Sequence, residues 1–235
     1  MESGVSNYIF ASSRSWNLDA FMKYRDRLPG SWQICVSAID LEVAADRNRP
    51  RYIFFPHWSS IVPKRFLENN ECVCFHMTDV PYGRGGSPLQ NLISRGHRET
   101  VLTALKMTPE LDAGPVYLKR PLSLDGKAEQ IFRHAAEICI EMIKEIVREE
   151  PVPTPQTGDP VYFARRKPEQ SALPRSGNLQ EIFDHIRMLD APGYPHAFMQ
   201  YGDWMATVTD AELRNGAIEA RVRIARSGHD DNEGA

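Results

Sequence analysis

The chain has 235 residues, enough for one sizeable hydrophobic core with or without a small additional domain. Hydrophobic residues make up 42% and charged residues 25%, as in ordinary soluble globular enzymes. The 28 Lys and Arg residues and the 31 Asp and Glu residues give a net charge of −3, so the composition lacks the basic excess typical of nucleic-acid-binding proteins.

The first residues, MESGVSNYIFASS, lack the charged and apolar regions of a signal peptide. No run approaches the roughly 18–20 apolar residues that a membrane span requires, so we expect a cytoplasmic protein without a membrane partner. Cys72, Cys74 and His76 alternate along one apparent strand, which raises the question of a metal site. No second ligand pair at a familiar spacing follows, so we expect no metal.

Short apolar segments alternate with helical segments in the first two thirds of the chain. Asn17 is the expected N-cap of a helix that reaches Arg27, before Pro29 and Gly30. The expected strands are residues 7–13, 32–38, 51–57, 71–76, 100–107 and 115–124, and the further expected helices are 63–69, 88–95 and 127–148. This alternation predicts an α/β fold with a Rossmann-like, mostly parallel sheet and helices on both faces.

The composition changes at Glu150, which we take as the end of a first domain, residues 1–150. Residues 151–177 are rich in proline and are expected to be a semi-rigid connection. Residues 178–226 are expected to form a small C-terminal α+β extension, with a helix capped by Asn178 and a β-hairpin around Asn215 and Gly216. Residues 227–235 are polar and are expected to be a disordered tail.

His76 ends an expected strand, and ligands of open parallel sheets bind beyond the carboxyl ends of the strands. The glycine-rich turn 83–86 follows, and its backbone N–H groups could face a negatively polarised ligand oxygen. Asp112 lies on a later loop before a strand. Each feature alone is a weak signal, because glycines and aspartates are common in ordinary turns.

The segments together are more specific. The strand ends Cys74-Phe75-His76, the loop 77–88 contains Pro81, Arg84-Gly85 and Pro88, and the acid loop is Leu111-Asp112-Ala113-Gly114-Pro115. They resemble the folate-dependent formyltransferases, whose pattern is Asn-x-His, a Ser-Leu-Leu-Pro loop with Arg-Gly, and Asp-x-Gly. The resemblance is good over residues 52–124. It implies that residues 1–150 are a formyltransferase catalytic domain and that 10-formyltetrahydrofolate is the co-substrate.

The resemblance implies that His76 polarises the formyl oxygen and that Asp112 sets the protonation of the histidine and assists deprotonation of the amine. Both roles agree with the effect of a carboxylate on an imidazole and of hydrogen-bond donors on an oxyanion. Cys74 stands where the family has asparagine, and a thiol is a weak donor. Another group such as His57, Trp58, Ser59 or Ser60 supplies the donor, or His76 and Asp112 suffice, or activity is lost.

The remaining candidate site residues follow from the same resemblance. The expected folate contacts are Pro56, His57, Trp58, Leu111 and Ala113. The expected substrate contacts are Thr78, Arg84, Gly85, Gly86 and Ser87. Tyr194, Phe198, Tyr201 and Trp204 are expected to pack the extension, with base stacking or dimer contacts as alternatives.

The residues YFARRKPEQS and IFDHIRMLDAPGYPHAF resemble the region after the catalytic domain in formyltransferases of methionyl-tRNA and of amino sugars. The short extension and the acidic charge favour a nucleotide-linked 4-amino-4,6-dideoxysugar as substrate, hence a role in polysaccharide biosynthesis, with no nucleic-acid partner. The alternatives are a methionyl-tRNA formyltransferase-like enzyme and a non-catalytic folate- or nucleotide-binding relative. A homodimer is a further expectation.

Overall fold

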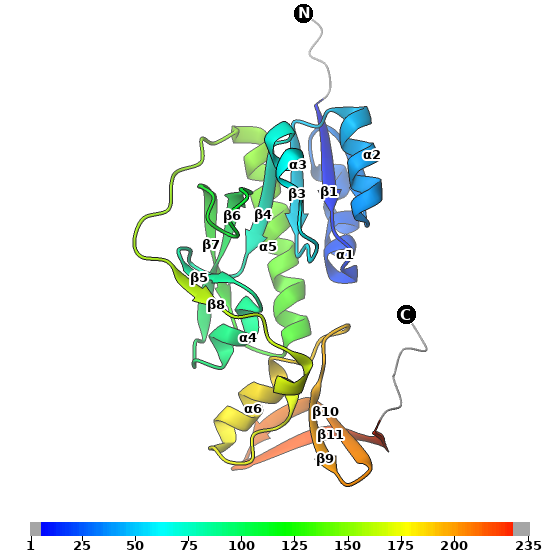
Figure 1. The fold of residues 1–235 in the computed structure, drawn as a ribbon, viewed down its shortest axis with the longest axis vertical. Coiled ribbons are helices and arrows are strands. Elements are labelled where there is room, and N and C mark those ends of the chain that lie inside the picture. The colour runs from blue at the N-terminus through cyan, green and yellow to red at the C-terminus, as the bar shows by residue number, and fades with distance from the viewer. Residues whose placement is uncertain (1–5, 228–235) are drawn as a thin grey trace, which may run out of the picture. The chain divides into compact units, whose positions relative to one another are not determined.

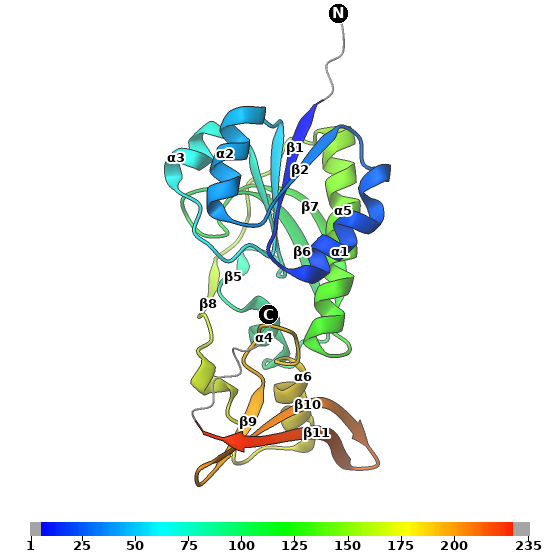
Figure 2. The same cartoon turned by 90° about the vertical axis from the view of Figure 1, so that its right-hand side faces the viewer.

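The computed structural model describes residues 6–227 (Figures 1 and 2). The chain forms two compact units that interleave along the sequence. As far as the described residues go, the first unit consists of residues 6–88, 99–123 and 132–164, and the second of residues 89–98, 124–131 and 165–227. The first unit thus continues to Ala164, beyond the domain end expected at residue 150. The tail expected at residues 227–235 lies outside the described residues, except for Ser227.

The first unit is built on a six-stranded sheet with the order β2-β1-β3-β4-β6-β7. Its strands are β1 (Asn7–Ala11), β2 (Ser31–Cys35), β3 (Tyr52–Pro56), β4 (Cys72–His76), β6 (Glu99–Lys106) and β7 (Val116–Ser123). The first four strands are parallel to one another, and β6 runs antiparallel to both β4 and β7. The expected mostly parallel, Rossmann-like sheet is confirmed.

Helices cover both faces of this sheet, as expected. They are α1 (Ser15–Tyr24) with the 3-10 turn η1 (Arg25–Arg27), α2 (Ala38–Asn48), α3 (Lys64–Asn69) and α5 (Ala128–Glu149). The short helix α4 (Pro88–Ile93) belongs almost entirely to the second unit. Figure 2 shows α2 and α3 on one face and α1 and α5 on the other. Within residues 6–227, no helix is both long and apolar enough to span a membrane.

The start of α1 differs from the expectation. Asn17 is not an N-cap, because the helix begins two residues earlier, after Arg14. The Asn17 side chain is buried, and its amide donates to Ser12 Oγ at 3.0 Å and to the Pro56 carbonyl at 3.1 Å. Asn17 therefore links α1 to the end of β3.

A small parallel pair of strands was not expected. β5 (Tyr82–Gly85) lies in the segment predicted to be a loop, and β8 (Val161–Phe163) lies in the segment predicted to be a connection. The Gly86 N–H donates to the Phe163 carbonyl at 3.0 Å. The chain after α5 thus returns to the loop that follows β4.

The second unit contains α6 (Leu179–Arg187), a 3-10 turn η2 (Pro168–Ser171) and an antiparallel sheet with the order β11-β10-β9. The sheet consists of β9 (Ala197–Tyr201), β10 (Trp204–Arg214) and β11 (Ala217–Arg226). Asn178 caps α6 by accepting from the Glu181 N–H at 2.9 Å. Asn215 and Gly216 have φ values of 50° and 75°, as a type I′ turn requires. The predicted capped helix and β-hairpin are confirmed.

Candidate functional site

His76 is the last residue of β4 and is buried, with 7% of its surface exposed. Its Nε2 atom lies 2.8 Å from the Gly83 carbonyl oxygen, so this nitrogen donates a hydrogen. Its Nδ1 atom lies 3.5 Å from Asp112 Oδ2. Both ring nitrogens therefore face oxygen atoms. A ring with a proton on each nitrogen could donate one hydrogen bond to each of these oxygens.

Asp112 lies on the loop between β6 and β7, and only 11% of its side chain is exposed. Its φ of 53° is left-handed, a conformation that Asp adopts more readily than most residues. The Gly85 N–H donates to its Oδ2 at 2.9 Å. The structure thus brings the two predicted central residues together, with one carboxylate oxygen shared by His76 and a backbone amide.

The glycine-rich turn has a different role from the one we expected. The Gly85 N–H binds the Asp112 carboxylate and the Gly86 N–H binds the Phe163 carbonyl, so neither amide is directed at a ligand. The expectation that these amides face a ligand oxygen is wrong in this conformation. Thr78 is completely buried and its hydroxyl donates to the Gly83 carbonyl at 3.3 Å, so it supports the turn.

Gln156 holds the Asp112 loop in place. Its Nε2 donates to the carbonyls of Asp112 and Gly114, each at 2.8 Å. Its Oε1 accepts from Arg84 Nε at 3.1 Å and from Nη2 at 2.8 Å. Sequence analysis missed Gln156 because it lies in the proline-rich segment. No periodicity in that segment marks its position, so the sequence alone carries no signal for Gln156.

Arg84 was expected to contact substrate. Only 11% of its side chain is exposed, and besides Gln156 it contacts Glu110 Oε1 at 3.3 Å. Tyr162 donates to the same carboxylate oxygen at 3.2 Å. In this structure the guanidinium therefore ties β5 to the Asp112 loop.

The path of the backbone explains why residue 114, in the loop that carries Asp112, is a glycine. A Cβ at this position would lie 1.7 Å from the Lys106 carbonyl oxygen, far inside van der Waals contact. The Lys106 N–H in turn donates to the Pro115 carbonyl at 2.9 Å. Only glycine fits where the loop passes so close to β6.

Cys74 is half-buried on β4 and packs against the apolar cluster that contains Phe55 and Leu41. Trp58 and Met107 contact the same cluster. Burial and the Asp112 carboxylate raise the pKa of the Cys74 thiol well above its ordinary value. The thiol is therefore neutral at physiological pH, which argues against a nucleophilic role.

The other three cysteines share this character, and we expect the native protein to resist thiol reagents. Burial raises the pKa of Cys35 to about 11 and that of Cys72 to about 12, and it raises that of Cys139 further. Titration with Ellman's reagent at pH 7.5 should detect no rapidly reacting thiol in native protein and four in guanidinium. A fast native thiol would contradict this assignment.

The candidate residues at the end of β3 divide into two groups. The Pro56 carbonyl is used by Asn17, and the His57 ring packs edge-on against Trp16 and Phe132, with centroids 5.4 and 4.8 Å away. These two residues pack the α1 side of the sheet. Trp58 points differently, since it packs on Phe55 and lines a hollow with Val62 and Phe66. The structure therefore gives His57 packing contacts with these aromatic rings.

His57 should make the fold sensitive to acid. Burial lowers the pKa of its imidazole from 6.5 to about 3, and the positive charge of Arg14 is a second, smaller cause. In the unfolded chain His57 takes up a proton near pH 6.5, but in the folded chain it does so only near pH 3. Protonation therefore favours the unfolded chain, and the free energy of unfolding decreases as the pH falls below 6.5. We expect urea unfolding between pH 7 and 4.5 to show a smaller loss of stability in His57→Asn, a residue that tolerates the left-handed φ of 53°. Identical pH dependence in both proteins would contradict this.

The remaining candidate residues lie on the loop that carries Asp112 and directly after the glycine-rich turn 83–86. Leu111 is 66% exposed, Ala113 is half-buried, and Ser87 is half-buried with a left-handed φ of 49°. Leu111 and Ala113 flank Asp112 in the sequence, and their contact with folate stays a prediction. Among the described residues there is no group of three or more His, Cys, Asp or Glu side chains placed to hold a metal ion.

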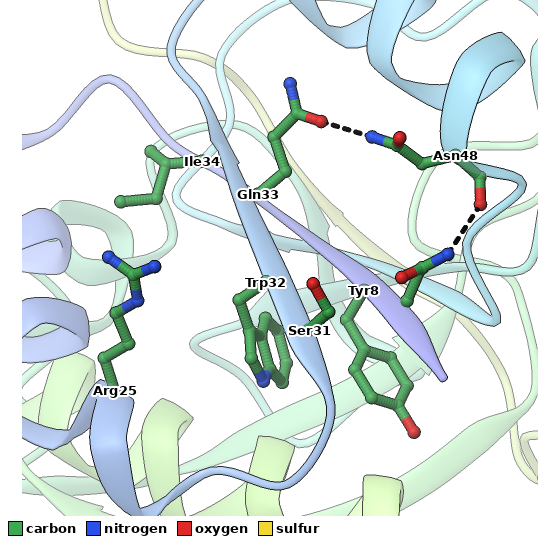
Figure 3. A pocket seen from close by; sticks show the side chains of 8 residues that line it. Tyr8, Arg25, Ser31, Trp32, Gln33, Ile34 and Asn48 are labelled. Carbon is green, nitrogen blue, oxygen red and sulfur yellow. Dashed lines mark hydrogen bonds between the residues drawn. The ribbon is translucent and has the colours of Figure 1, made fainter. Parts of the chain in front are cut away.

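A separate hollow of about 440 Å³ lies along β2, the edge strand of the sheet (Figure 3). Its walls include Trp32, Arg25 and Tyr8, and Asn48 donates to Gln33 across it. Its lining includes neither His76 nor Asp112. The hollow therefore lies apart from the candidate site.

Comparison with known proteins supports the resemblance. Residues 168–225 match the family model "Methionyl-tRNA formyltransferase, C-terminal domain". A methionyl-tRNA formyltransferase of Sinorhizobium medicae is 30% identical over 185 residues, which are 74% of this chain and 55% of that protein. The chain thus spans about half the length of this curated relative.

Solved structures match over longer ranges. A methionyl-tRNA formyltransferase from Clostridium thermocellum has a TM-score of 0.91 and 43% identity, covering 94% of this chain and 100% of that one. A sugar N-formyltransferase from a Shewanella species has the same fold, with a TM-score of 0.64 at 13% identity over 92% of this chain and 96% of that one. The 43% identity over nearly the whole of both chains shows that this protein belongs to the folate-dependent formyltransferase family.

Proposed function

We propose that the protein transfers a formyl group from 10-formyltetrahydrofolate to an amine at the site formed by His76 and Asp112. The observation that carries this proposal is the nearly buried pair itself, with Nδ1 of His76 3.5 Å from Asp112 Oδ2 at the carboxyl end of β4. An acid–base pair at this place suits a reaction in which one oxygen gains negative charge and one amine loses a proton.

The residues present fit a folate. Trp58, Val62 and Phe66 line an apolar hollow, and they and Cys74 pack on the same core cluster. Trp58 and Phe66 would hold the flat ring system of the folate through apolar contacts, and the irregular backbone of residues 57–63 would offer it polar groups. When bound, 10-formyltetrahydrofolate supplies the formyl group, and its own nitrogen is the leaving group.

The chain's own residues would act as follows. His76 holds a proton beside the formyl oxygen and stabilises the negative charge that develops there. For this the Nε2 donor turns from the Gly83 carbonyl, since catalytic hydrogen bonds are often engaged elsewhere before substrate binds. Asp112 balances the charge of the imidazole and accepts the proton that the amine loses. This proton then passes to the folate nitrogen as the bond between that nitrogen and the formyl carbon breaks. Cys74 contributes shape rather than a hydrogen bond, so His76 and Asp112 carry the reaction.

For the acceptor we propose the α-amino group of methionyl-tRNA. The supporting observations are the family match at residues 168–225 and the 43% identity with the Clostridium thermocellum protein. A nucleotide-linked 4-amino-4,6-dideoxysugar is the second candidate. The net charge of −3 favours it, because tRNA binding needs a basic surface.

One assay separates these candidates. The protein is incubated with 10-formyltetrahydrofolate and either methionyl-tRNA or a panel of UDP- and dTDP-linked 4-amino sugars, and products are identified by mass spectrometry. Formylmethionyl-tRNA as the main product supports the first acceptor, and a formylated sugar alone supports the second. No formylated product from either would contradict the proposed function.

Gln156 should affect the reaction without touching the substrate. Gln156→Ala removes four hydrogen bonds that hold Arg84 and the carbonyls of Asp112 and Gly114, so Asp112 loses its fixed position. We expect kcat to fall by about tenfold, because small displacements of catalytic groups are costly. The matched control is Gln170→Ala, in the exposed turn η2 of the other unit. An unchanged kcat in Gln156→Ala would contradict the role.

A further inference from the structure

The buried carbonyl of Gly83 accepts hydrogen bonds from two side chains. His76 Nε2 donates to it at 2.8 Å, and the Thr78 hydroxyl donates to it at 3.3 Å. A hydrogen bond from a hydroxyl group to an oxygen is usually about 2.7–2.8 Å long. The histidine therefore makes the better bond and the threonine a longer one, so the proposed catalytic group shares its acceptor with a second donor.

The fold fixes Thr78 so that its side chain faces Gly83. Neither Thr78 nor Thr103 is exposed, and the Thr103 hydroxyl donates to the Thr78 carbonyl at 2.8 Å. Thr103 in turn lies opposite His76 in the register of β4 and β6. A Cβ at residue 83 would lie 2.7 Å from the methyl carbon of Thr78. The methyl group and the hydroxyl of Thr78 are thus both next to Gly83.

The second donor matters when His76 moves. A turn of the imidazole away from Gly83 breaks the 2.8 Å bond to a buried carbonyl, and leaving such a carbonyl without a donor is unfavourable. The Thr78 hydroxyl is already directed at the same oxygen. It has to approach by only about 0.5 Å to form a bond of ordinary length.

We propose that Thr78 is a positioning residue that allows His76 to leave the Gly83 carbonyl, because its hydroxyl replaces the imidazole as the donor to that oxygen. In the reaction described above, His76 turns its Nε2 donor to the formyl oxygen, so the effect of Thr78 on the rate rests on that proposed function. Thr78 was expected to contact substrate. Since it is completely buried, it acts through His76 instead.

Hydrogen exchange at His76 measures this role in the free protein. The ring is buried, so the hydrogen on Nε2 exchanges with water only after its bond to Gly83 opens. Thr78→Val removes the hydroxyl, so the open state loses its donor to Gly83. NMR of protein with isotope-labelled histidine should show exchange slowed by about tenfold. A purely structural loss would have the opposite effect, because a less stable protein opens more often.

Two further variants isolate the hydroxyl. Thr78→Ser keeps a donor and should exchange within about threefold of the wild-type rate. The matched control Thr100→Val makes the same change at a hydroxyl that donates to the Met77 carbonyl at 3.2 Å. Its exchange at His76 Nε2 should stay within about twofold of wild type, since its bond is to the neighbouring carbonyl. If Thr78→Val does not fold, Thr78→Cys takes its place, because a thiol is a weak donor.

The rate of formyl transfer gives the second readout. Thr78→Val should lower kcat by about tenfold and leave the KM of both substrates within about twofold, because the donor is needed after the substrates have bound. Thr78→Ser should recover most of the wild-type kcat.

Unchanged or faster exchange in a Thr78→Val protein that circular dichroism shows to be folded would overturn the role of Thr78. Slower exchange with an unchanged kcat would support the replacement of one donor by the other and would instead contradict the turn of His76 in the proposed function. The exchange measurement needs neither folate nor acceptor, so it tests Thr78 even if no formylated product is found.

Discussion

Replacing His76 with alanine should lower kcat/KM for formyl transfer by roughly a hundred- to thousand-fold. His76 lies at the end of β4, where we propose that its ring places a proton beside the formyl oxygen, and loss of a donor to a developing oxyanion typically has an effect of about this size. The measurement is the initial rate with whichever of the two proposed acceptors the product assay shows to be formylated, at saturating 10-formyltetrahydrofolate. Circular dichroism and thermal unfolding show whether the variant is folded, since His76 is buried.

The matched control for this variant is His134→Ala, an exposed histidine on α5 in the same unit. It should keep the wild-type rate within about twofold, as expected of surface substitutions. A folded His76→Ala protein with the wild-type rate would contradict the proposed mechanism. It would leave the family assignment intact, because that rests on sequence and fold.

Asp112→Asn should lower kcat by about a hundred-fold. Asparagine keeps an oxygen for the Gly85 N–H and tolerates the left-handed backbone, so the loop should keep its shape. It removes the negative charge 3.5 Å from His76 Nδ1, and an amide cannot accept the proton of the amine. Loss of a general base typically reduces rates by about a hundred- to ten-thousand-fold.

Glu110→Gln is the control, because it makes the same acid-to-amide change on the same loop. Glu110 contacts Arg84 but not His76, and two thirds of its side chain is exposed. Its rate should stay within about threefold of wild type. Equal losses in both variants would mean that the loop, rather than the Asp112 carboxylate, determines the rate.

The features that sequence analysis located correctly are those set by short-range chemistry. His76 could be placed because a buried strand ends there and ligands bind at such ends. The hairpin at Asn215 and Gly216 and the cap at Asn178 depend on residues within a few positions of one another. Asp112 required the family motif, since its partner Gly85 is 27 residues away in the sequence.

The features that sequence analysis missed depend on distant partners. Asn17 has the residue type of a cap, but its amide is satisfied by a carbonyl 39 residues away. The α2 helix was not predicted because Ile39 and Val43 are exposed while Leu41 is buried, which blurs its apolar stripe. The β5–β8 pair joins two segments with no strand periodicity of their own. Its existence depends on the path of the whole chain.

The return of the chain at β8 sets a lower limit on the active fragment. A protein cut at Glu150 would still contain the strand of His76 and the loop of Asp112. It would lack Gln156, and the Gly86 amide would lose its acceptor on Phe163. Proteolysis within residues 151–160 should therefore inactivate the enzyme even though both chemical groups survive. The proline-rich segment thus supports the proposed catalytic site, and we expect that it cannot be exchanged freely as a linker when domains of this family are recombined.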